Sequence, residues 1–139
     1  TQDADALKAL VAVVLDTAGG PRLRELAAKA LSGTDDADAL KSLAAVLKDA
    51  QQGPALRNCV AEALTGTQDA DALKALVAVV LDTAGGPRLR ELAAKALSGT
   101  DDADALKSLA AVLKDAQQGP ALRNCVAEAL TGTQDADAL

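Results

Sequence analysis

The chain has 139 residues, the size of one domain, and half of it is apolar although it contains no Phe, Trp, Tyr, Met or His. Its net charge of −6 argues against a nucleic-acid surface, which needs Lys and Arg to displace counterions from phosphates. The longest apolar run, Ala9–Leu15, is far shorter than the roughly 20 residues that cross a bilayer. We therefore expect a soluble protein, cytoplasmic if natural or recombinantly expressed, with no nucleic-acid or membrane partner.

An exact repeat organises the chain. Residues 1–66 recur letter for letter as residues 67–132, and residues 133–139 begin a third copy. Each copy has two halves of 33 residues that agree at 19 positions, and we call the first half the A repeat and the second half the B repeat. A period of this length predicts a stack of repeats. We expect one all-α solenoid over 1–139, with A-B-A-B repeats at 1–33, 34–66, 67–99 and 100–132 and the start of a fifth at 133–139.

The first helix of the A repeat begins after Asp3, the expected N-cap. The spacing of one buried helical face follows at Leu7, Leu10, Val11 and Val14. Val13 and Leu15 widen this face, as expected for a helix that is covered on more than one side. The helix is expected to end at Ala18-Gly19-Gly20, because glycine tolerates the left-handed conformation that closes a helix.

The second helix of the A repeat begins at Pro21, which suits a first helical turn. Its expected buried face consists of Leu23, Leu26, Ala27, Ala30 and Leu31, and it ends at Ser32-Gly33. The B repeat follows the same plan, with a break at Gln51-Gln52-Gly53-Pro54. Its apolar positions are Leu40, Leu43, Val46 and Leu47 in helix one and Leu56, Cys59, Val60, Ala63 and Leu64 in helix two.

These residues resemble the short HEAT repeat. The B repeat has Asp36-Ala-Asp-Ala-Leu-Lys-Ser-Leu in helix one, Asp49 in the turn, and Pro54-Ala-Leu-Arg57 followed by Ala61-Glu-Ala-Leu64 in helix two. The family pattern is D-P-x-A-V-x-x-L, a turn Asp, P-x-V-R and A-x-x-A-L, and the resemblance covers the whole chain four times. It implies a ladder between repeats made by Asp16 with Arg24, Asp49 with Arg57, Asp82 with Arg90 and Asp115 with Arg123.

The chain departs from the family pattern at three places in each repeat. Ala4 and Ala37 replace the usual helix-one proline, and Thr34 and Thr67 stand where the family packs an aliphatic residue. The turn between the two helices is two residues longer than in the commonest short form. These departures leave the superhelical pitch open but keep the fold class.

No residue pattern predicts catalysis or a bound group. The carboxylates of Asp35, Asp36 and Asp38 lack the glycine and bidentate Glu of a calcium loop, so helix capping explains them better. Cys59 and Cys125 have no histidine to activate them or to complete a zinc site. Two repeats separate these cysteines, on the order of 20 Å, whereas a disulfide needs Cα atoms within about 7 Å. We expect two small core residues, no enzyme activity, no cofactor and no metal.

The HEAT resemblance also implies a protein-binding groove on the helix-two side. Its polar positions are Arg22, Glu25, Lys29, Arg57, Asn58 and Glu62. An ordinary solvated face is the plainer interpretation of the same residues. Because the copies are identical, a groove there would present the same groups at a regular step and suit a periodic protein or peptide partner.

Two hypotheses for function follow. Identity over 66 residues favours an engineered or consensus-type repeat protein whose function is its architecture. Since its end repeats are as apolar as the interior ones, we expect it to stack with itself head to tail, into a ring or a filament. The alternative is a fragment of a natural HEAT-like protein-binding scaffold or a tandem-repeat antigen, which the unequal half-repeats and Cys59 favour.

Overall fold

The computed structural model describes residues 3–49, 51–82, 86–115 and 117–131. Within these ranges the chain forms eight α-helices and no β-strand, which confirms the predicted all-α solenoid. The expected start of a fifth repeat at 133–139 lies outside the described residues. The helices are α1 (Ala4–Leu15), α2 (Pro21–Ala30), α3 (Ala37–Lys48), α4 (Pro54–Ala63), α5 (Ala70–Leu81), α6 (Pro87–Ala96), α7 (Ala103–Lys114) and α8 (Pro120–Leu130).

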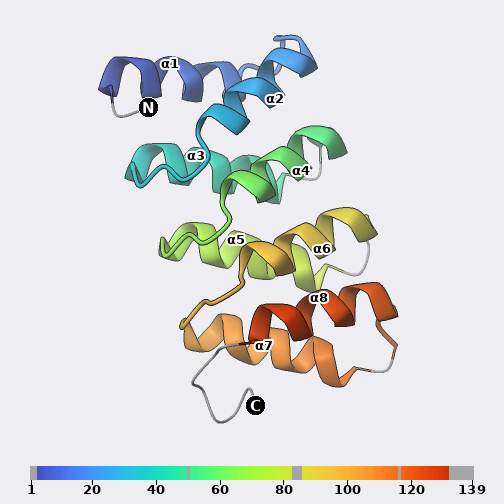
Figure 1. Ribbon diagram of the computed structural model, residues 1–139. Coiled ribbons are helices and arrows are strands. Elements are labelled where there is room, and N and C mark those ends of the chain that lie inside the picture. The colour runs from blue at the N-terminus through green and yellow to red at the C-terminus, as the bar shows by residue number, and fades with distance from the viewer. Residues whose placement is uncertain (1–2, 50, 83–85, 116, 132–139) are drawn as a thin grey trace.

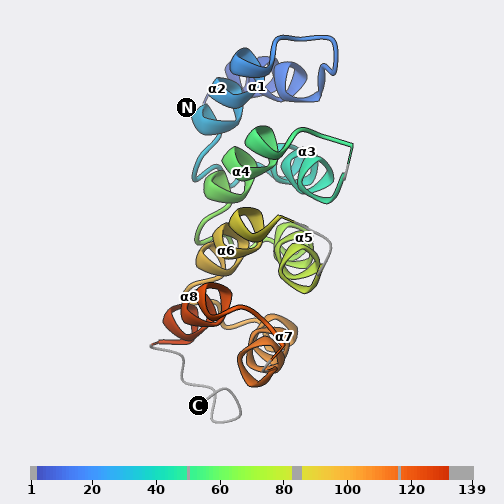
Figure 2. The same cartoon turned by 90° about the vertical axis from the view of Figure 1, so that its right-hand side faces the viewer.

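The helices form pairs, one pair in each 33-residue repeat, and the pairs stack along one axis (Figure 1). The odd-numbered helices make one side of the stack and the even-numbered helices make the other (Figure 2). Each helix contacts its partner in the same repeat, as α1 contacts α2, and the matching helix of the next repeat, as α2 contacts α4. No helix in the described ranges is long and apolar enough to cross a membrane.

Each odd-numbered helix begins at the predicted aspartate. The Asp36 Oδ2 atom accepts the Ala39 N–H at 3.0 Å, and Asp3 does the same for Ala6 at 3.2 Å, so both predicted N-caps are confirmed. The Thr34 Oγ1 atom accepts the Asp36 N–H at 3.2 Å. The family departure at Thr34 therefore has a structural role, because the hydroxyl holds the chain in the turn that precedes the cap.

Helix one of the A repeat ends earlier than predicted. The sequence predicts an end at Ala18-Gly19-Gly20, whereas α1 ends at Leu15 and Asp16 has an extended backbone with φ −78° and ψ 99°. The Asp16 Oδ1 atom accepts the Ala18 N–H at 3.0 Å. This side chain therefore offers the backbone an alternative to the next helical hydrogen bond, which is the reason that the helix stops there.

The core is a continuous layer of Leu, Val and Ala between the two helix rows, and Leu31, Leu64 and Leu97 are almost completely buried in it. The prediction that Leu15 belongs to a covered face is wrong. Leu15 is 47% exposed, and its counterpart Leu81 inside the stack is 48% exposed. The neighbouring helices leave this side of α1 and α5 uncovered, so its exposure belongs to the A repeat and not to the end of the stack.

A glycine at the end of each repeat links it to the next. Gly33, Gly66 and Gly99 have φ values of 76°, 79° and 76°, in the left-handed region that L side chains rarely adopt. Their N–H groups donate to the carbonyls of Ala63, Ala96 and Ala129, in helix two of the following repeat, at 3.3, 3.1 and 3.3 Å. The left-handed turn therefore sets where each repeat lies on the one before it.

Replacing Gly66 by alanine is expected to lower the free energy of unfolding by about 1–2 kcal/mol, the cost of holding an L residue at φ 79°. A Cβ at this position meets no atom within 4 Å, so the loss comes from backbone strain and not from a clash. Urea unfolding followed by circular dichroism measures it.

The matched control is Gly53→Ala. This glycine also has open space around it, but its φ of −63° suits any residue, so the expected loss is below about 0.5 kcal/mol. Equal losses for the two variants would contradict the role assigned to the left-handed turn.

Candidate functional site

The four arginines of the predicted ladder bind carbonyl groups at the ends of the odd-numbered helices. The Arg57 Nε and Nη2 atoms donate to the Leu47 carbonyl at 2.9 and 2.7 Å. Arg24 and Arg90 make the same pair of hydrogen bonds to the carbonyls of Val14 and Val80, and Arg123 donates through Nε to the Leu113 carbonyl at 3.0 Å. A helix end leaves such carbonyls without partners, so the guanidinium group fastens helix two to helix one of its own repeat.

The aspartates of the predicted ladder fold the turn between the helices. The Oδ1 atoms of Asp49 and Asp115 accept the N–H groups of Gln51 and Gln117, each at 2.9 Å, as Asp16 does for Ala18. Asp82 precedes residues 83–85, which lie outside the described part of the chain. These contacts of the aspartates lie within one repeat, and the pairing of Asp with Arg between repeats stays a prediction.

One side-chain hydrogen bond does connect two repeats at this position. The Arg90 Nη2 atom donates to the Gln118 Oε1 atom of the next repeat at 2.9 Å. Gln118 also donates through Nε2 to the Asp115 Oδ2 atom at 3.3 Å. The sequence predicts only a break between the helices at this Gln-Gln pair, whereas the structure gives its second member a place in the stacking contact.

The predicted groove residues lie on the even-numbered helices, where Arg22 and Lys29 of α2 and Glu62 of α4 are exposed and Glu25 is half-buried. Burial raises the pKa of the Cys59 thiol, and the carboxylate of Glu25 raises it further, whereas the ammonium of Lys29 lowers it. These charges thus lie near Cys59, and the protein-binding groove stays a prediction. Asn58 is half-buried, and its Oδ1 atom has no hydrogen-bond partner among the described residues.

Cys59 and Cys125 are free thiols buried in the core. Burial raises the pKa of Cys125 as well, although Lys95 lowers it. A protonated thiol is a poor nucleophile, and the chain contains no histidine that could act as its base. The expectation that both cysteines serve as small core residues agrees with these surroundings.

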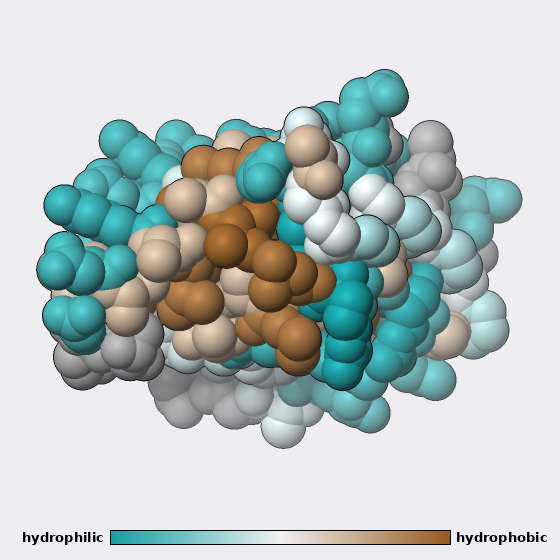
Figure 3. All heavy atoms as spheres, turned by 90° about the horizontal axis from the view of Figure 1, so that it is seen from above, coloured by the Kyte–Doolittle hydropathy of each residue, from teal (hydrophilic) through white to brown (hydrophobic). Residues whose placement is uncertain are grey.

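The end of the stack formed by α1 and α2 carries an apolar patch, which we call the end face. Seen along the stack axis, apolar side chains gather over these two helices and polar side chains surround them (Figure 3). Leu23 is 56% exposed and Leu26 is 44% exposed, whereas the identical positions Leu89 and Leu92 in the third repeat are 4% and 7% exposed. Sequence and local structure are the same at both places, so the difference comes only from the preceding repeat.

Two equivalent grooves, which we call the outer grooves, lie along the odd-numbered helices. Each has a volume of about 310 Å³. The first lies between α1 and the start of α3, and the second lies between α5 and the start of α7. The first is lined by Ala4, Leu7, Lys8, Val11, Ala12, Leu15, Asp36 and Asp38, and the second by the residues 66 positions later.

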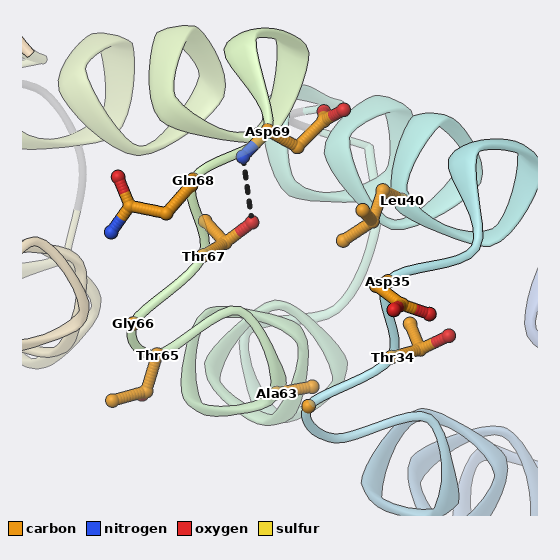
Figure 4. Close-up of a pocket in the computed structure, with 10 residues that line it drawn as sticks. Thr34, Asp35, Leu40, Ala63, Thr65, Gly66, Thr67, Gln68 and Asp69 are labelled. Atoms are coloured by element: carbon orange, nitrogen blue, oxygen red, sulfur yellow. Dashed lines mark hydrogen bonds between the residues drawn. The ribbon is translucent and has the colours of Figure 1, made fainter.

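A third hollow of about 380 Å³ lies at the loops between repeats, and Asp35 and Asp69 are among the residues that line it (Figure 4). The Asp69 N–H donates to Thr67 Oγ1 at 3.2 Å, and Asp69 Oδ2 accepts the Ala72 N–H at 3.0 Å. Helix capping thus occupies the Asp69 carboxylate. Among the described residues there is no group of three His, Cys, Asp or Glu side chains placed to hold a metal ion.

The sequence matches no known protein-family model and no curated protein. The HEAT resemblance rests on the residues quoted above and stays a prediction.

Arg57→Lys is expected to lower the free energy of unfolding by about 1–3 kcal/mol, because lysine cannot make two hydrogen bonds to the Leu47 carbonyl. Asp49→Asn is expected to cost less than about 0.5 kcal/mol, because the amide oxygen can still accept the Gln51 N–H. Urea unfolding at low and high salt measures both. A loss for Asp49→Asn that equals the loss for Arg57→Lys and disappears in high salt would show an ion-pair ladder instead.

Both thiols are expected to react with a disulfide reagent far more slowly in the folded chain than in denaturant. Because folding raises their pKa, the folded chain binds protons more tightly, so stability falls as pH rises above about 8.5, the ordinary thiol value. Unfolding measured between pH 7 and pH 10 checks this. The double variant Cys59→Ala/Cys125→Ala is expected to lose this pH dependence. If its stability falls with pH as steeply as that of the wild type, groups other than the thiols cause the pH dependence.

Proposed function

We propose that this protein is a structural repeat scaffold without catalytic activity, whose end face associates head to tail with a further copy of the chain. One observation carries the proposal. Leu23 and Leu26 are about half exposed, while their identical counterparts Leu89 and Leu92 are buried by the repeat before them. The same apolar face is covered where a repeat precedes it. We infer that this surface is adapted to pack against such a repeat.

The occupant of the end face follows from the order of the repeats. Inside the chain, α3 contacts α5 and α4 contacts α6, so a B repeat covers the face of an A repeat at this junction. The fourth repeat has the same sequence as the second. The surface of α3 and α4 that contacts α5 and α6 therefore recurs on α7 and α8, where it can contact the end face of another copy. Association of two copies would repeat an interface that already exists within the chain.

The opposite end of the stack supports this pairing. Ala61 is buried in α4 by the repeat that follows it, whereas its counterpart Ala127 in α8 is exposed. Leu47 is fully buried, and Leu113 is only half-buried. The residues left uncovered at α7 and α8 are thus those that contact an A repeat at the interior junction. Such a contact joins two different surfaces, so it produces a ring or an open filament.

The exact 66-residue repeat supports an engineered or consensus-type origin, in which surface and loop residues are copied together with the core. The alternative, a natural protein-binding scaffold, is supported by the charges that gather around Cys59 on the even-numbered helices. Further diverged repeats in the complete gene would favour the natural origin.

The apparent mass of the wild-type protein is expected to rise with concentration in light scattering coupled to size exclusion. Leu23→Glu/Leu26→Glu is expected to remain a folded monomer, because the two side chains are exposed in the isolated chain but would lie buried in the assembly. Small-angle scattering over the same range measures the length of the particles. A wild-type protein that stays monomeric at the highest concentration would refute the proposal.

Leu15→Lys is the matched control. Leu15 is as exposed as Leu26, but its counterpart Leu81 remains 48% exposed inside the stack. The substitution therefore replaces a leucine of similar exposure outside the junction and is expected to assemble like the wild type. Loss of assembly in this control would show general surface stickiness and not head-to-tail contact.

A further inference from the structure

The outer grooves are apolar surfaces that stacking does not cover. Leu15 and Leu81 have the same exposure at the end of the chain and in its interior, so an additional repeat would leave both grooves open. Leu7 and Val11 continue the apolar floor along α1, one helical turn apart from each other. Leu7 is covered by stacking, because its counterpart Leu73 inside the stack is 5% exposed. Val11 and Leu15 keep the exposure of their counterparts Val77 and Leu81, so head-to-tail association gives these two residues no partner and their exposure needs a separate explanation.

The grooves lie on the A repeats, because two of the positions that line them carry different residues in the B repeats. The sequence places Leu15, Lys48, Leu81 and Lys114 in turn at the last position of the odd-numbered helices. Val11 and Val77 likewise alternate with alanines in α3 and α7. The odd-numbered side of the stack therefore presents an apolar floor in every second repeat and a lysine in the repeats between.

The charge at the rim of each groove is acidic. Asp36 and Asp38 come from the start of α3 and face the first groove, while Lys8 is the one cation among its lining residues. Asp36 uses Oδ2 to cap its helix, whereas the carboxylate of Asp38 makes no hydrogen bond or ion pair within the described part of the chain. The last residue of helix one is Lys48 in the B repeat and Leu15 in the A repeat. The groove on the A repeat therefore lacks the cation that the B repeat carries at this position.

We propose that the outer grooves bind basic amphipathic segments of a partner protein, one segment in each groove. A bulky aliphatic side chain of the segment lies on Val11 and Leu15, and its Lys or Arg residues face Asp36 and Asp38. A volume of about 310 Å³ is at the lower end of small-molecule pockets, about 300–1,000 Å³, and suits a few side chains of a longer ligand.

The partner that fits best carries two such segments. The grooves are identical and lie two repeats apart, about 16–20 Å from the usual spacing of packed helices. A chain that presents basic amphipathic segments at this step engages both grooves, and the second contact forms at a high effective concentration. A negatively charged nucleic acid or membrane surface would instead be repelled by the acidic rims.

Titration calorimetry with a synthetic helical peptide of leucine and lysine in an amphipathic pattern tests the proposal. The wild-type chain is expected to bind two peptides. Leu15→Lys is expected to bind one, and Leu15→Lys/Leu81→Lys is expected to bind none or to bind at least about tenfold more weakly, because the apolar contact is lost and a like charge is added. The B repeats already carry lysine at this position, so these variants keep the fold, which circular dichroism verifies.

Two controls separate the grooves from other surfaces. The same peptide with glutamate in place of lysine is expected not to bind, and the end-face variant Leu23→Glu/Leu26→Glu is expected to keep both sites. No binding by the wild type, unchanged binding by Leu15→Lys/Leu81→Lys, or equal binding of the acidic peptide would each overturn the proposal. Because the end-face variant affects assembly and the groove variants affect peptide binding, failure of one proposal is distinguishable from failure of the other.

Discussion

Burial of apolar faces between neighbouring repeats is the interaction on which the rest of this structure depends. A repeat of 33 residues built from Ala, Leu and Val, without aromatic side chains, cannot enclose a core of its own. Its two helices are covered only when a neighbouring pair packs against them, as the buried Leu89 and Leu92 and the exposed Leu23 and Leu26 demonstrate in one chain. Stability, shape and the proposed association at the end face therefore depend on the same surface.

Apolar contact alone would allow neighbouring helix pairs to slide or rotate, and polar groups at fixed positions restrict this freedom. The left-handed glycine ends each repeat and donates a hydrogen bond to the next one, as Gly66 does to Ala96. Within a repeat, the arginine of helix two holds a carbonyl at the end of helix one, as Arg57 does with Leu47. Each polar group recurs in every repeat for which the structure describes it, so the geometry of one junction propagates along the stack.

The two sides and the end of the stack differ in what they leave available. The end face exposes apolar side chains that a preceding repeat buries at the equivalent position inside the stack, and the outer grooves are apolar because the A repeat has leucine where the B repeat has lysine. The even-numbered side presents charged residues around buried thiols whose pKa is raised. A scaffold role uses the first surface and partner binding uses the second, so the two proposals require no common residue.

The sequence by itself determined the repeat boundaries, the all-α class, the aspartate caps and the proline starts of the even-numbered helices, because all of these depend on local spacing and backbone preferences. The sequence misplaced the end of α1, since Asp16 and the following glycines are competing signals for the end of a helix. It also assigned Leu15 to the core, because periodicity identifies a helical face without showing what covers that face. Only the tertiary structure decided which identical residues are buried, where the arginines donate and that Gly66 reaches Ala96, because these depend on the position of the neighbouring repeat.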